Sequence, residues 1–350
     1  MANNQIVQIR SGSKNKSSGK KKSKSKKSKT TVMQPAARYL RYVLPNVSAG
    51  ATNTYYIDLA NDLSKLNRRL YRQGRDYHVK RVTIMSAETI SGVGWTDGVA
   101  PPADMYQQNA GLVRISGAPD GWVTRNAWKR GFASYDAMNK AAMRTVASDV
   151  KGTWADYKVY LNNGHRTGTI AVPKDLDDND ILAGEWVYSK YVSPDQTTTD
   201  DEYTAHLLGG HIGAAGNFTS IGLIESYGLS RPTVVSGSPN EPGTPMDTDP
   251  LNNLLDFGEV NQEILENVRS DNDIPPYNVD EYIGDASNLP APQVLGMTTL
   301  GSDGRGVIPS FSAVCGLLRI DTKSPTDDDG FEVLIELAAG SYRGIKAEAL

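Results

Sequence analysis

The sequence contains one cysteine, four histidines and five phenylalanines in 350 residues. A lone cysteine, Cys315, cannot form an internal disulfide or a multi-cysteine metal site. Because Cys315 lies in the apolar run from Ala313 to Leu318, we expect it in the core. No stretch approaches the roughly 18 apolar residues of a membrane-spanning helix, and the first residues lack the apolar core of a signal peptide. We therefore expect a protein that is neither secreted by a signal peptide nor membrane-spanning.

No acidic residue precedes Asp58, and this absence divides the chain electrostatically. The formal net charge of the whole chain is only −3. Ten of the 37 basic residues lie in the first thirty positions, whereas the other 27 and all 40 acidic residues lie in the remaining 320. This asymmetry indicates a cationic arm that meets nucleic acid and an acidic body that stays soluble.

The arm is dominated by Ser11 to Lys29, where nine lysines are separated almost only by Ser, Gly and Asn. Without apolar residues it cannot offset the entropy of ordering, so residues 1–35 are expected to form a disordered arm. A flexible chain of lysines binds polyanions irrespective of sequence, because each phosphate contact releases counterions. A solubilising tail or a nuclear-import signal has the same composition. The residues expected to bind nucleic acid are Arg10, Lys14, Lys16, Lys20, Lys21, Lys22, Lys24, Lys26, Lys27, Lys29, Arg38 and Arg41.

The body, residues 36–350, has a composition that suits strands and turns, with 17 tyrosines, 33 glycines and 18 prolines. Alternating or apolar runs predict strands that do not alternate regularly with helices, which argues against a parallel doubly wound sheet. We expect a mainly β fold, a single antiparallel jelly-roll sandwich with elaborated loops and a few short helices. The predicted strands are 37–47, 52–59, 76–90, 112–116, 159–161, 168–172, 186–192, 203–208, 218–225, 307–320 and 331–338.

A helix is predicted over Asn61 to Arg72, because Leu63, Leu66 and Leu70 share one face. Its other face is either an ordinary solvated surface or a second, inner basic patch. This patch would consist of Arg68, Arg69, Arg72 and Arg75. Further helices are expected over 133–150 and after the capping box Asp256 and Glu259, and Asn162-Asn163-Gly164 is a candidate hairpin turn.

Catalytic and metal-binding patterns are weak in this chain. His206 and His211 are five residues apart around two glycines, a spacing that neither a helix nor a strand places on one face. Acidic clusters at 175–180, 200–202 and 327–329 could hold calcium between subunits, but solvated loops explain them more simply. Dinucleotide, P-loop and nucleophile-elbow motifs are missing. We expect no enzyme, no cofactor and no metal.

One short stretch resembles a known family. Glu263 to Asn267, followed by Asp271 to Tyr277 (DNDIPPY), resembles the acidic helix and DNDxPPY segment of capsid proteins from small circular single-stranded DNA viruses that encode a replication initiator, the CRESS-DNA viruses. A basic arm before one β-rich body is also the layout of such coat proteins. Many of them have an Arg-rich arm, whereas this one is almost purely Lys.

The resemblance implies a capsid protein that self-assembles into an icosahedral shell of at least about 60 copies and packages circular single-stranded DNA. It implies residence in the virion and, during assembly, in the host nucleus. A nuclear-import receptor and a cell-surface receptor would be further partners. The loops 91–108, 192–202 and 236–250 are candidates for outer or inter-subunit surfaces, from their polarity and length.

Three other interpretations stay open at this point. A cellular nucleic-acid-binding protein with a basic tail would bind selectively even without residues 1 to 30. A coat protein of a small RNA virus would have the same arm, because lysines do not distinguish ribose from deoxyribose. An enzyme built on a β-sandwich would need His206, His211 and a carboxylate to converge.

Replacing the nine arm lysines by Gln tests the assignment of the arm. The variant should remain folded, because no apolar contact is lost, but its affinity for single-stranded DNA should fall strongly at low salt. The wild-type protein should show a steep negative slope of log affinity against log salt, about −0.7 for each phosphate contacted. A slope unchanged by the substitutions would mean that the lysines are not the main contacts.

Overall fold

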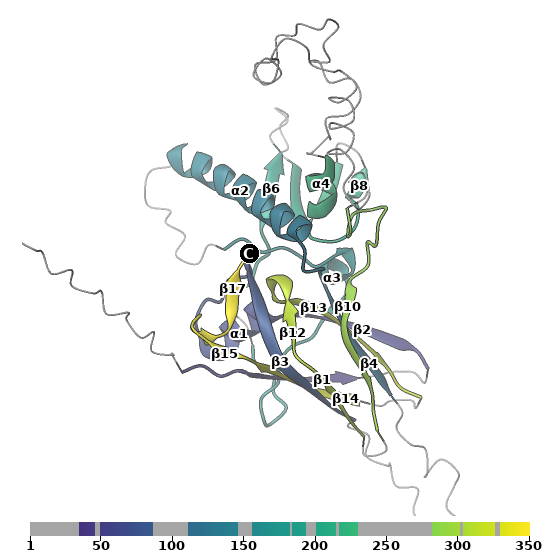
Figure 1. The fold of residues 1–350 in the computed structure, drawn as a ribbon. Coiled ribbons are helices and arrows are strands. Elements are labelled where there is room, and N and C mark those ends of the chain that lie inside the picture. Colours follow the sequence, from purple (N-terminus) through teal and green to yellow (C-terminus); the bar gives the residue numbers. More distant parts are fainter. Residues whose placement is uncertain are drawn as a thin grey trace, which may run out of the picture. The chain divides into compact units, whose positions relative to one another are not determined.

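The computed structural model describes ten stretches of the chain, all within the compact unit Met33–Leu350. They are mainly β-strands with a few helices, as the composition predicts (Figure 1). The arm residues 1–34 lie outside the described part of the chain. The described stretches are residues 35–45, 50–86, 111–145, 156–182, 184–193, 201–214, 217–229, 282–301, 304–325 and 330–350.

The first sheet is antiparallel, in the order β1-β14-β3-β11. Its central strand β3 has 12 residues and also pairs with the short strands β12 and β17. The strand predicted from the alternation along residues 76–90 is therefore confirmed as far as Ser86, and it is the central strand of this sheet. The strands of this sheet are β1 (Tyr39–Pro45), β3 (Arg75–Ser86), β11 (Arg305–Ile308), β12 (Phe311–Ala313), β14 (Gly330–Leu337) and β17 (Ala347–Ala349).

The second sheet has the order β10-β4-β13-β2, also antiparallel, and the two-residue strand β5 adds to β2 in parallel. Two of its four main strands lie before residue 118 and two after residue 292. Its strands are β2 (Thr52–Asp58), β4 (Leu112–Gly117), β5 (Thr169–Ile170), β10 (Gln293–Thr299) and β13 (Leu317–Lys323).

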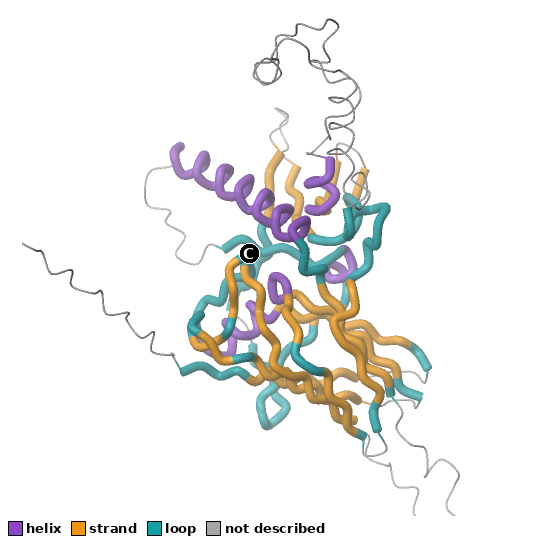
Figure 2. The backbone as a smooth tube through the Cα atoms, in the orientation of Figure 1, coloured by secondary structure: helices purple, strands orange, loops and turns teal. Residues whose placement is uncertain are grey.

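The eight main strands pair in a nested pattern. β1 pairs with β14, β2 with β13, β3 with β11 and β4 with β10, so the first four strands meet the last four in reverse order. In chain order the strands belong to the first, second, first, second, second, first, second and first sheet. Figure 2 shows how these strands run through the two sheets.

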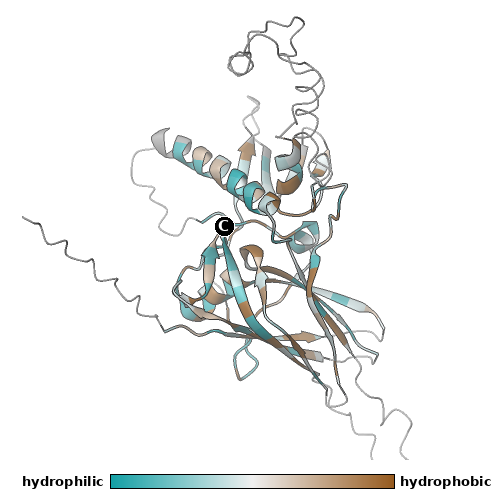
Figure 3. Ribbon diagram, viewed as in Figure 1, coloured by the Kyte–Doolittle hydropathy of each residue, from teal (hydrophilic) through white to brown (hydrophobic). Residues whose placement is uncertain are grey.

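The two sheets share one apolar core. Along β1, Leu40, Tyr42 and Leu44 are buried and alternate with more exposed residues. They belong to the same cluster as Ile57 of β2 and Ile115 of β4, so side chains from both sheets meet between them. Each such side chain contributes about 1.5–3 kcal/mol when fully buried. Figure 3 shows apolar residues along the strands of both sheets.

A long insertion separates β4 from β10 and builds a second core. Its four-stranded sheet has the order β6-β7-β9-β8, and α2 and α4 contribute buried residues to the same cluster. Tyr56, Leu317 and Cys315 join this cluster from the sandwich, which confirms that the cysteine is a core residue. The elements are α2 (Trp122–Thr145), α3 (Asn163–Thr167), β6 (Lys190–Ser193), β7 (Asp201–His206), β8 (Ile212–Ala214), β9 (Asn217–Gly222) and α4 (Leu223–Leu229).

Three local predictions are wrong. The Asn162-Asn163-Gly164 segment is no hairpin turn, because the Asn162 side chain caps α3 by accepting from His165 N. The strand predicted over 307–320 is broken, because Cys315 and Gly316 take φ values of +58° and +70°. The helix predicted from 133 begins at Trp122 instead. Gly131 lies inside this helix, where close packing requires a glycine: a Cβ at this position would come within 2.5 Å of Tyr157 Oη.

A buried carboxylate links the sandwich to the insertion. Asp58 ends β2 and caps α1 (Leu59–Asn67), accepting from the backbone N–H groups of residues 60 and 61. Its Oδ2 also accepts from Gln73 Nε2 (3.1 Å), Trp186 Nε1 (3.2 Å) and Tyr188 Oη (3.3 Å). Burial raises the pKa of Asp58 to about 7, above its ordinary value of 3.8. Burial likewise raises the pKa of the neighbouring Asp62 to about 6.

Asp58→Asn tests this carboxylate through pH. Asn keeps an acceptor for α1 but cannot titrate. The stability from the raised pKa of Asp58 is fully present below 3.8 and is lost as pH rises through about 7. The unfolding free energy of wild type minus that of the variant should therefore increase by about 2 kcal/mol from pH 8 to pH 5.5.

Denaturant titrations of both proteins at the two pH values provide this difference. Burial lowers the pKa of His165 to about 3 and of His206 to about 4, so both histidines destabilise the fold on acidification. They are present in both proteins and cancel in the comparison. A difference that does not change with pH would contradict the assignment.

Candidate nucleic-acid interface

The chain enters the body beside the end of α1. Ala37 N donates to Asn67 Oδ1 (2.8 Å), and Asn67 Nδ2 donates back to Ala37 O (3.0 Å). Arg69 donates to Pro35 O (3.4 Å). We define the arm root as residues 35–38. It is held by Asn67 in the last turn of α1 and by Arg69 just after the helix.

The helix ends earlier than predicted, and this changes where its cations lie. α1 stops at Asn67, and Arg68 terminates it in the left-handed conformation with φ +52°. Within the helix, Lys65 directs its ammonium to the buried Asp62 (3.1 Å) and is itself only 8% exposed. The predicted basic residues at 68, 69, 72 and 75 thus follow the helix and do not form its solvent face.

Of these four arginines, the two later ones are engaged within the fold. Arg72 forms an ion pair with Asp156 (2.9 Å), and the Arg75 guanidinium lies 3.7 Å from the centre of the Tyr342 ring. Arg68 and Arg69 are exposed at the end of α1. Arg69 also donates to Pro35 O, so this pair presents exposed positive charge beside the arm root, which itself contains Arg38.

Arg38 and Arg41, which are predicted to bind nucleic acid, differ in their contacts within the fold. Arg41 lies on β1 between Glu332 and Asp178, with an ion pair to each, and donates to Asp175 O (2.8 Å). These carboxylates raise the pKa of Arg41 and compensate its charge. Arg38 belongs to the arm root, where its carbonyl accepts from Leu337 N (2.9 Å). Binding of nucleic acid by either residue stays a prediction.

A pocket of about 460 Å³ opens beside the arginine pair. Trp186 lines this pocket, and its Nε1 donates a hydrogen bond to Asp58. The Lys158 ammonium lies 4.7 Å from the centre of the indole ring. We call this cavity the root pocket. Its lining residues are Asn61, Ser64, Lys65, Arg68, Arg69, Leu70, Lys158, Gly184, Glu185 and Trp186.

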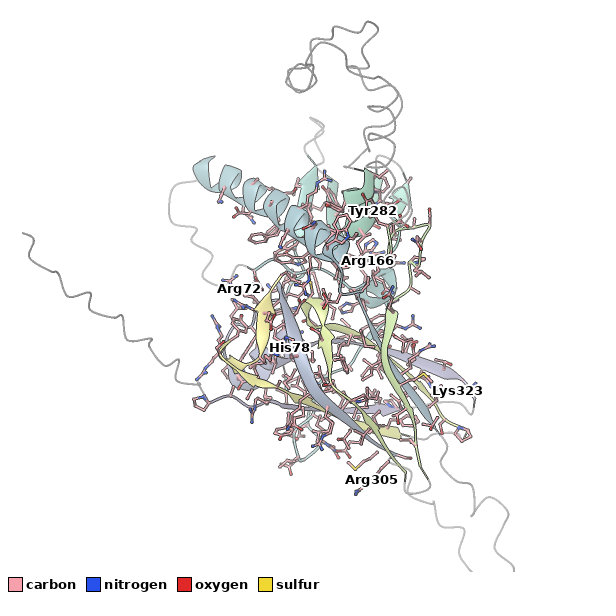
Figure 4. All side chains as sticks on the ribbon, viewed as in Figure 1. Arg72, His78, Arg166, Tyr282, Arg305 and Lys323 are labelled. Carbon is pink, nitrogen blue, oxygen red and sulfur yellow. The ribbon has the colours of Figure 1, made fainter. Side chains whose placement is uncertain are left out.

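No local sequence pattern predicts the root pocket as a unit. Lys158 and Trp186 come from the insertion, far along the chain from α1, and each is unremarkable in its own segment. The bond of Trp186 to Asp58 and the bonds of Gln73 to Val159 bring these segments next to α1. Figure 4 labels Arg72, which follows α1, and Lys323, which lies across the fold from it.

The histidines have structural partners. His206 is buried, and its Nε2 donates to Gly210 O (3.0 Å) while Nδ1 accepts from Ser220 Oγ (2.7 Å). His211 Nδ1 accepts from Gly222 N (3.1 Å) and lies 3.2 Å from Glu225 Oε2. A carboxylate thus reaches His211, but both ring nitrogens of His206 are used inside the core.

Three of the four acidic residues of the 175–180 cluster contact cations or backbone N–H groups through their side chains. Asp178 contacts Arg41, Asp180 contacts Lys174 (2.6 Å), and Asp175 accepts from the backbone of Asp177 and Asn179. In the described ranges no three metal-ligating side chains gather into a metal site. Asp200 of the second cluster and the whole of the third cluster, 327–329, are outside those ranges.

Several predicted features fall on residues outside the described part of the chain. They are the arm residues Arg10 to Lys29, the loops 91–108 and 236–250, the helix at 256–268, and the stretch Glu263 to Tyr277. The described helices are too short or too polar to cross a bilayer. Comparisons of the chain with protein-family models, curated proteins and solved structures give no match.

Asn67→Ala tests the anchoring of the arm root. Loss of the two bonds to Ala37 should lower the unfolding free energy by about 1 kcal/mol and speed amide hydrogen exchange at residues 37 and 38. Asn61→Ala on the same helix is the matched control and should leave this exchange unchanged. Equal exchange in wild type and Asn67→Ala would show that these bonds do not hold the root.

Proposed function

We propose that this chain is a structural capsid protein that assembles into a closed icosahedral shell and packages a circular single-stranded DNA genome through its arm. The single observation that carries the proposal is the junction between arm and body. A segment with nine lysines leads directly into β1, and its root is anchored beside exposed arginines on an otherwise acidic body. Such a junction would allow the cationic chain and the basic surface to contact the same nucleic acid.

The body in this proposal is a single jelly roll. Nested pairing of the first four strands with the last four is what results when one long antiparallel ribbon is rolled into two facing sheets. The two observed strand orders follow from that rolling. A sandwich of this kind has loops and sheet edges that neighbouring copies can cover, which suits assembly into a shell.

Electrostatics is compatible with packaging. Sixty copies, the smallest icosahedral shell, would bring roughly 600 arm charges, because each arm carries about ten. That number neutralises part of a genome of a few thousand nucleotides, so additional cations are needed. Arg38, Arg68 and Arg69 lie at the arm root or beside it and supply some of them. The same lysines suit a nuclear-import signal, in keeping with assembly in the host nucleus.

Assembly of the purified full-length chain tests the function. Mixed with circular single-stranded DNA, it should form uniform closed particles visible in electron micrographs and a matching peak in light scattering. A strictly monomeric protein at high concentration, with and without DNA, would contradict the proposal.

Particles purified from expressing cells add a second criterion. DNA should be the nuclease-protected polymer in them, and protected RNA would favour the RNA-virus alternative. Selective binding that survives neutralisation of the arm, without any particles, would favour the cellular nucleic-acid-binding protein.

A further inference from the structure

We propose that the root pocket binds one nucleotide of the packaged strand, with the phosphate on Arg68 and Arg69 and the base against Trp186 and Leu70. The proposal rests on the function above and specifies a second contact for the same polymer. A strand held by the arm lysines would reach this pocket directly, because Arg69 lines the pocket and also donates to Pro35 O of the arm root.

The charges of the pocket favour an anion. Lys65, Arg68, Arg69 and Lys158 face one acidic residue, Glu185, in the lining. Lys65 is compensated by Asp62, and Lys158 is largely buried over the indole ring, so these two contribute mainly to the local field. Arg68 and Arg69 are exposed residues, and Arg69 also donates to Pro35 O. Their guanidinium groups suit a phosphate, since a guanidinium can form two parallel bonds to it.

The remaining lining suits a base. About 460 Å³ lies within the range of ~300–1,000 Å³ that is usual for small-molecule sites, which is too small for a duplex but accommodates one nucleotide. Trp186 is held rigidly through its Nε1 bond to Asp58, so the ring is positioned before any ligand enters. Stacking on an aromatic ring is available to every base, so the pocket should bind without marked sequence preference.

The experiment uses the full-length chain with its nine arm lysines replaced by Gln, so that the arm does not mask the pocket. Binding of fluorescein-labelled pentathymidylate is measured by anisotropy, with dTMP as competitor. Arg68→Gln with Arg69→Gln should weaken binding about tenfold or more. Lys129→Gln with Lys323→Gln removes the same charge from exposed positions outside the pocket and is the matched control.

A gain of affinity separates the proposal from misfolding. Glu185→Gln removes the one acidic side chain of the lining and should strengthen binding several-fold. Gly184 also lines the pocket, and a Cβ there meets no atom within 4 Å. Gly184→Glu should therefore weaken binding relative to Gly184→Gln, which has the same size and no charge.

The outcomes of the two proposals are distinguishable. If the arm-neutralised protein does not bind the oligonucleotide, or if the arginine, Glu185 and Gly184 variants bind as it does, the pocket assignment is wrong, and particle formation by the wild-type chain still decides the proposed function. If the variants change binding as expected while the wild-type chain forms no particles, the pocket stands and the capsid function fails. Displacement by dTMP supports a single-nucleotide site, whereas displacement only by oligonucleotides overturns it.

Discussion

The buried carboxylate of Asp58 is the interaction on which the candidate interface depends. It caps α1, whose end holds the arm root, and it fixes Trp186 in the root pocket. It also accepts from Gln73, which in turn bonds both backbone groups of Val159. Three segments that are distant in sequence are thereby held on one acceptor in the interior. Because an unpaired buried donor costs about 1–3 kcal/mol, this geometry is strongly constrained.

The distribution of cations follows a second constraint. Within the acidic body, most described arginines of the sheets and of α2 are compensated: Arg114 by Asp321, Arg125 by Asp76 and Asp120, and Arg41 by Glu332 and Asp178. These ion pairs leave few of the described arginines in the sheets and in α2 available to a polyanion. Under the proposed function, the positive charge available to nucleic acid is therefore concentrated in the arm and at its root, while the rest of the body carries an excess of acidic residues.

The sequence allowed β1 to β4 to be predicted: β1 buries every second side chain and parts of β3 and β4 alternate, although the last four residues of β2 are all buried. β10 (Gln293–Thr299) is not among the predicted strands. The pairing of strands far apart in the chain was not readable from local pattern. The ends of α1 and α2 were misplaced for physical reasons: Arg68 adopts a left-handed conformation, and Gly131 is required for close packing against Tyr157. The sequence also does not show which carboxylate pairs with a given cation, so the ion pairs of Arg41 with Glu332 and of Lys65 with Asp62 are visible only in the fold.

The orientation of the body in an assembled particle tests the central claim most directly. A three-dimensional reconstruction of nucleic-acid-filled particles would show which surface of the sandwich faces the interior. The account predicts that the end of α1, with Arg68, Arg69 and the arm root, faces inward and contacts density of the packaged strand. Particles in which this surface faces outward, with the internal density touching another part of the body, would contradict it.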